Sequence, residues 1–272
     1  MTTSTKFLLA GLLTSLALAA PQDFPLNKPF DASVALDARL APVRLSFNNQ
    51  PVLLVGSPKN VQKIPLDTVA DELNPAARGA VLIRDFDFDG RKDLGIPSGV
   101  GYGGVNIFYT VYRYQPASKT FVPMSGNDFP VCNPEFSEGA QVLVTNSRSG
   151  PMWYGLDYKF KQGKPWVYRR RSPVLLEDLA KEADLLTLFE IHSPQGKVVQ
   201  SFLSSDSTQA KPVSIVLKQD VSISKVPGAR GLSGLLKAGQ TVTLDKVERS
   251  GSHLYVHAPA GWILLPDESV HR

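Results

Sequence analysis

The sequence predicts an all-β protein. Short runs rich in Val, Ile, Tyr, Phe and Thr alternate with clusters of Gly, Pro, Asn and Asp, a texture typical of strands separated by turns. An aspartate-rich stretch at residues 85–94 lies between two strand-like runs and predicts an acidic hairpin loop. The chain has one cysteine, Cys132, so a hydrophobic core and not a disulfide framework has to hold the strands together. We expect an antiparallel sheet domain followed by a smaller β unit.

The first residues predict export. An apolar run from Phe7 to Ala20 follows Lys6, and small residues precede the expected cleavage site after Ala19. The alternative is a membrane anchor, but the run is shorter than the ~20 apolar residues that a span needs. We therefore expect a signal peptide at residues 1–19, a periplasmic or secreted mature protein and no transmembrane segment after its removal.

Strands and turns can be placed along the remaining chain. The clearest strand candidates are residues 43–47, 51–55, 79–84, 107–114, 141–146 and 153–161. Gln162-Gly163 predicts the tip of one hairpin, and Pro194-Gln195-Gly196 predicts the turn of another. A helix is expected over residues 172–186, because Ser172 can cap it, Pro173 suits its first position and apolar residues follow at helical spacing.

A change in composition predicts a domain boundary near residue 210. Residues 204–212 are rich in Ser, Thr and Gln and lack large apolar side chains, which is typical of a linker. The residues after it number about 60, a size that can fold alone. We therefore expect one domain at residues 20–205 and a second at residues 212–272.

The acidic stretch DFDFDGRKD, residues 85–93, predicts a metal site. Alternation of aspartate with phenylalanine lets the carboxylates converge on one side while the rings pack on the other. Gly90 supplies the left-handed backbone of a tight turn. Crowded carboxylates repel one another unless a cation lies among them, and oxygen ligands without His or Cys suit Ca²⁺. The predicted ligands are the side chains of Asp85, Asp87, Asp89 and Asp93 and the carbonyl oxygen of Arg91.

The loop differs from an EF-hand, because its twelfth position holds Ile96 and not Glu. It resembles the Asp-rich hairpin loop of calcium-binding β-propeller repeats of the FG-GAP and integrin type. The loop occurs once, so a complete repeat array is not supported and we expect a propeller-like sheet domain. The alternative is a solvated acidic turn without a metal.

The resemblance extends over residues 40–200. FDGRKDL is followed by GVGYGGVNIFYTVYRY, YQPASKTFV, NPEF and YKFKQGK, the order found in exported bacterial proteins that carry one calcium loop. Some members of that family are periplasmic inhibitors of peptidoglycan hydrolases. The resemblance implies the metal ligands, and it implies a peptidoglycan hydrolase or a cell-wall component as partner. It assigns no inhibitory residue.

The second domain is similar to bacterial SH3 domains. LLKAGQTVTL, HLYVHA and GWILL follow in the usual order, with Trp262 after Gly261. This implies a small SH3-like barrel, and such domains often bind cell-wall peptides or partner proteins in an aromatic groove. Tyr255 and Trp262 are the only aromatic residues of this copy, so a scaffold role is an equal alternative.

No catalytic signature supports an enzyme. The sequence contains neither a Gly-x-Ser-x-Gly elbow nor a His-Glu-x-x-His motif. No such signature therefore supports a general base among the four histidines, His192, His253, His257 and His271. A net charge of +4 is too small to indicate nucleic acid as a partner. We expect a calcium-binding, non-enzymatic binding module, with inhibition of a cell-wall hydrolase as its leading role. The alternatives are an envelope enzyme or accessory targeted by its SH3-like domain, and a structural envelope protein.

Two further features have a functional and a structural interpretation. Arg169-Arg170-Arg171 can face an acidic partner, but a solvated edge strand protected by charge is the favoured interpretation. Cys132 can join two chains, but a small buried side chain is favoured.

Overall fold

The computed structural model describes residues 22–57, 60–66, 79–124, 129–182, 185–207, 209–229, 231–250 and 253–265. The all-β prediction is confirmed, since the described residues form antiparallel sheets joined by loops. The helical segments in these ranges are two short 3-10 turns, Tyr102–Gly104 and Glu138–Ala140. The predicted signal peptide lies outside the described residues. Within the described ranges, no helix is long and apolar enough to cross a membrane.

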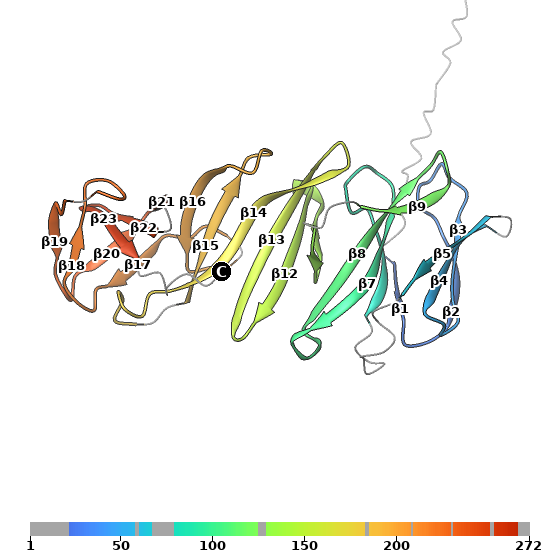
Figure 1. The fold of residues 1–272 in the computed structure, drawn as a ribbon, viewed down its shortest axis with the longest axis horizontal. Helices are drawn as coiled ribbons and strands as arrows, with labels where there is room; N and C mark the ends of the chain where they lie inside the picture. The colour runs from blue at the N-terminus through green and yellow to red at the C-terminus, as the bar shows by residue number, and fades with distance from the viewer. Residues whose placement is uncertain are drawn as a thin grey trace, which may run out of the picture.

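Three larger sheets and a C-terminal unit follow one another along the long axis of the molecule, in chain order except for β1, which belongs to the second sheet (Figure 1). Sheet 1 is a meander of β2 (Phe30–Val34), β3 (Val43–Phe47), β4 (Val52–Ser57) and β5 (Asn60–Pro65). Sheet 2 has the order β1 (Gln22–Pro25), β6 (Ala80–Arg84), β7 (Asp93–Gly101), β8 (Asn106–Gln115) and β10 (Val131–Cys132), with β9 (Thr120–Pro123) also paired to β8.

Sheet 3 is a second meander and contains the longest strands. Its order is β11 (Glu135–Ser137), β12 (Val142–Ser149), β13 (Met152–Lys161), β14 (Lys164–Leu175), β15 (Leu185–His192) and β16 (Val198–Ser204). Both predicted hairpins are confirmed: Gln162 and Gly163 turn the chain from β13 to β14 with φ of 53° and 71°, and Gly196, with φ of 78°, lies in the turn from β15 to β16.

The C-terminal unit consists of three small antiparallel sheets, and its described strands do not close into a barrel. β17 (Val213–Val216) pairs with β20 (Thr241–Leu244), and β18 (Val221–Ile223) pairs with β19 (Gly234–Leu236). β21 (Lys246–Ser250), β22 (His253–Ala258) and β23 (Gly261–Leu265) form the third sheet.

Hydrophobic clusters join each pair of neighbouring layers. One cluster lies between sheets 1 and 2, and a second, which contains Phe86 and Tyr158, lies between sheets 2 and 3. A third joins sheet 3 to the C-terminal unit and includes both Leu203 and Val213. The predicted linker at residues 204–212 therefore connects two parts of the chain that share one core.

The predicted helix at residues 172–186 is wrong. β14 continues through Ser172 and Pro173 to Leu175, and it pairs with β15 up to the Leu175–Leu185 register. The apolar spacing of this segment fits a strand as well as a helix. Pairing with β15 buries Val174 and places it in the core with the C-terminal unit, so tertiary packing decides between the two.

The predicted edge strand at Arg169-Arg170-Arg171 is also wrong. β14 lies inside sheet 3, between β13 and β15. Arg169 and Arg171 share a face, as the alternation predicts, but both lie against the fully buried carboxylate of Asp157 on β13, at 2.5 and 2.8 Å. These two arginines therefore face a buried carboxylate of a neighbouring strand and not solvent.

Candidate metal centre

The acidic loop joins the antiparallel strands β6 and β7, which pair up to Arg84 and Asp93. The chain turns tightly, because both Phe88 (φ 58°) and Gly90 (φ 87°) adopt left-handed backbone angles. The predicted left-handed glycine is thus confirmed at Gly90. No atom lies within 4 Å of the position that a Cβ there would take, so the backbone angle and not lack of space requires glycine.

The two phenylalanines of the loop point into the core. The ring of Phe86 is fully buried and meets Phe136 edge-on at 5.0 Å, and Phe88 meets Phe160 at 6.1 Å. Gly95 on β7 makes room for Phe86, because a Cβ at this position would lie 2.6 Å from the ring. The rings therefore anchor one side of the loop and leave the other side to the aspartates.

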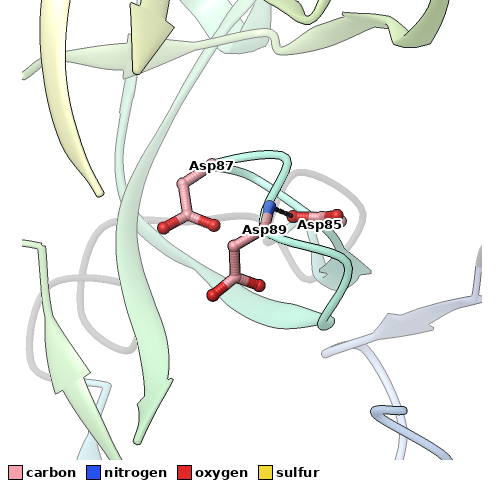
Figure 2. Close-up of side chains that lie close together, drawn as sticks. All are labelled: Asp85, Asp87 and Asp89. Atoms are coloured by element: carbon pink, nitrogen blue, oxygen red, sulfur yellow. Dashed lines mark hydrogen bonds between the residues drawn. The ribbon is translucent and has the colours of Figure 1, made fainter. Parts of the chain in front are cut away.

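Three carboxylates converge on that other side. Asp85, Asp87 and Asp89 each offer an oxygen within 4.8 Å of the others (Figure 2). Asp85 accepts hydrogen bonds from the backbone N–H groups of Asp89 and Gly90 at 3.0 and 2.8 Å, the first of which is drawn in Figure 2. Asp89 accepts from the N–H of Arg91 at 2.9 Å. The turn itself thus holds two of the three side chains in place.

Asp87 is the unusual member of this group. Its side chain is fully buried, and neither carboxylate oxygen accepts a hydrogen bond from the described residues. The Nε atom of Arg113, on β8, lies 2.9 Å from its Oδ2 and supplies positive charge without hydrogen-bond geometry. A buried carboxylate whose oxygens lack hydrogen bonds is unfavourable, so this side chain fits a site where a cation completes its surroundings.

Carboxylates outnumber the cations of the loop. Four aspartates, Asp85, Asp87, Asp89 and Asp93, are accompanied by Lys92 and by Arg91 and Arg113, both of which lie within 3.1 Å of Asp89, so negative charge is in excess. Burial, and then the charge of Asp89, raises the pKa of Asp87 to about 6. Burial also raises the pKa of Asp85. Without further positive charge, ionised carboxylates are therefore disfavoured here.

Asp93 lies outside the group of three converging carboxylates. Its two oxygens accept hydrogen bonds from the backbone N–H groups of Phe86, at 3.2 Å, and Tyr114, at 3.1 Å. Burial, followed by the charge of Asp87, raises its pKa well above the usual range. Asp93 thus ties the start of the loop to β8. Its role as a ligand, like that of the Arg91 carbonyl oxygen, stays a prediction.

Sequence reasoning missed Arg113. It lies on a later strand, predicted at residues 107–114 for its β-branched and aromatic residues. No local pattern indicates that its guanidinium reaches the aspartates, because the contact depends on how β8 pairs with β7.

The described histidines have contacts elsewhere. The Nδ1 atom of His192 lies 3.3 Å from the carbonyl of Gly196 in its own hairpin, and that of His257 lies 2.7 Å from Asp245. His271 lies outside the described residues. Cys132 is buried and free, which agrees with its interpretation as a small core side chain.

The comparison with known proteins returned no match among protein-family models, curated proteins or solved structures. The assignment of the site therefore depends on the residues and the geometry described above.

Proposed function

We propose that this chain is an exported calcium-binding protein that acts by binding and not by catalysis. The observation that carries the metal assignment is Asp87, whose buried oxygens lack hydrogen bonds within a group of converging carboxylates. The ligand set contains oxygen only, which favours a hard cation. The spacing of the loop, similar to that of calcium-binding propeller repeats, favours Ca²⁺ over Mg²⁺, and Ca²⁺ accepts irregular sets of ~6–8 oxygens.

Asp85, Asp87 and Asp89 would hold the ion, with Asp93 and the carbonyl of Arg91 completing the predicted set. The ion would supply the positive charge that the loop lacks. The role is structural, because the same loop places Phe86 and Phe88 in the core between sheets 2 and 3. A cation that binds the folded loop and not the unfolded chain stabilises the fold by mass action.

Thermal unfolding tests the metal assignment. Calcium should raise the melting temperature of the purified mature chain, and a chelator should lower it, with magnesium giving a smaller shift. Asp87→Asn should remove most of the calcium-dependent shift. Asp178→Asn is the matched control, since Asp178 is an exposed aspartate outside the loop. A melting temperature that is the same with calcium and with chelator would refute the assignment.

The resemblance over residues 40–200 supports a peptidoglycan hydrolase as the binding partner, and it also supports the propeller-like character of the first domain. The similarity of residues 212–272 to SH3 domains supports a targeting or scaffold role for the C-terminal unit. A pull-down from envelope extract tests the partner: recovery of a hydrolase whose activity falls on binding supports inhibition. Turnover of purified peptidoglycan by the protein alone would instead support the alternative, an envelope enzyme.

A further inference from the structure

A cavity of about 440 Å³ lies on the face of sheet 3 opposite the Asp157 side chain. Phe108 and Cys132 from sheet 2 line one side of it, and Arg249 from β21 of the C-terminal unit lines another. The volume falls within the range of sites that hold small molecules, ~300–1,000 Å³. None of the metal-loop aspartates lines this cavity, so it is a separate feature of the molecule.

One row of side chains across sheet 3 forms the floor of the cavity. Thr145 pairs with Leu156, Leu156 with Arg170, and Arg170 with Glu190, on four consecutive strands. Residues directly opposite each other in an antiparallel sheet point to the same face. The guanidinium of Arg170 therefore belongs to the face that lines the cavity.

The charges along this row are unbalanced. Glu190 is buried and forms an ion pair with Arg249 at 2.8 Å, although Arg170 is its cross-strand partner. Arg170 is left exposed, and no ion pair or hydrogen bond of its side chain occurs within the described chain. The side chain of Arg171 lies on the opposite face of the sheet, where it pairs with Asp157, so it adds no charge to this row. The lining of the cavity thus contains one exposed guanidinium without a counter-charge, Arg170, and a second guanidinium, Arg249, that shares the single carboxylate Glu190.

Hydroxyl groups converge on the same space. Ser147 and Ser172 line the cavity, and their hydroxyls have no hydrogen-bond partner among the described residues. The Tyr154 hydroxyl reaches the sulfur of Met152 at 4.0 Å, a weak acceptor. The two serine hydroxyls are unused donors beside a surplus positive charge, the tyrosine hydroxyl has only this weak acceptor, and Phe108 and Leu156 add apolar surface.

We propose that this cavity binds a small organic anion. Its carboxylate or phosphate group contacts Arg170 and Arg249, and its apolar part contacts Phe108 and Leu156. Guanidinium groups bind both kinds of anion through paired, charge-assisted hydrogen bonds. The hydroxyls of Tyr154, Ser147 and Ser172 supply further donors to the anion.

Calorimetric titration of the mature chain with benzoate, phenyl phosphate and neutral benzyl alcohol tests the proposal. At least one of the two anions should bind saturably and about tenfold more tightly than the alcohol, and the stronger one identifies the preferred acid group. Raising NaCl from about 0.05 to about 0.5 M should weaken this binding. Absence of saturable binding of both anions at concentrations up to about 10 mM would overturn the proposal.

Two variants locate the site. Arg170→Ala should weaken anion binding about tenfold while its melting temperature stays that of the parent chain, because the side chain is exposed. Lys164→Ala, an exposed cation on the same strand, is the control and should bind as the parent does. Tyr154→Phe removes one hydroxyl and should cause a smaller loss. If Arg170→Ala binds the anion as tightly as the parent chain, the proposal is wrong.

Discussion

The Nε atom of Arg113 lies 2.9 Å from Oδ2 of Asp87, which places a guanidinium from β8 beside the carboxylates of the β6–β7 loop. Its Nη2 atom also hydrogen-bonds Asp89 at 3.1 Å. Arg113 therefore offsets part of the loop's negative charge when no other cation is present. It also connects the loop to sheet 3, since its guanidinium lies against Gly163 at the β13–β14 turn.

Replacing Arg113 should separate its electrostatic role from its packing role. Arg113→Gln removes one positive charge beside the loop carboxylates, which should tighten calcium binding about tenfold, or ~1.4 kcal/mol. The same variant should melt at a lower temperature than the parent chain in chelator, because the carboxylates lose a counter-charge. Titration calorimetry and thermal melts measure the two effects. Arg44→Gln, an exposed arginine on β3, is the control, and loss of calcium binding in Arg113→Gln would contradict the electrostatic account.

The close approach of the Phe86 ring to Gly95 predicts that a larger side chain at position 95 destabilises the fold. A Cβ added at position 95 would lie 2.6 Å from the Phe86 ring, which is fully buried and has little freedom to move. Gly95→Ala should therefore lower the free energy of unfolding by about 1–3 kcal/mol, as measured by urea denaturation. Gly139→Ala is the control, since no atom lies within 4 Å of its added Cβ. Equal stability of the two variants would show that the ring can shift.

The ion pairs of Asp157 predict a large effect on stability outside the acidic loop. It is fully buried and lies 2.5 and 2.8 Å from Arg169 and Arg171. Asp157→Asn leaves two guanidiniums without their counter-charge and should cost about 3–5 kcal/mol of stability. Asp220→Asn makes the same change in an exposed pair with Lys237 and should cost less than about 1 kcal/mol. Denaturant unfolding measures the free energy of unfolding of both variants. Similar decreases in the two variants would contradict this account.

The burial of Cys132 predicts that the free energy of unfolding depends on pH. Burial raises the pKa of its thiol to about 11, above the 9.0 of an exposed thiol. The folded chain therefore keeps this proton longer than the unfolded chain does, and the free energy of unfolding should fall as the pH rises from 9 toward 11. Iodoacetamide at pH 8 should modify Cys132 more slowly in the folded chain than in urea, because the raised pKa leaves less thiolate, and mass spectrometry can follow the reaction. Equal rates of modification in the folded chain and in urea would contradict the raised pKa.

Local patterns were enough to predict part of the fold and of the site. The strand at residues 43–47 was predicted with the bounds observed for β3, and both hairpin turns were placed correctly, because alternation and turn residues act over a few positions. The convergence of Asp85, Asp87 and Asp89 was predicted for the same reason: all three belong to one tight turn.

What the sequence by itself determined is the β class, the turns and the acidic loop, since each depends on neighbouring residues. Only the tertiary structure decided that Pro173 lies in a strand, that Arg169 and Arg171 face a buried carboxylate, and that Arg113 reaches the acidic loop. These outcomes depend on which strands become neighbours. Burial and ion-pair energies between distant segments arise only once the strands have paired, so no local spacing contains them.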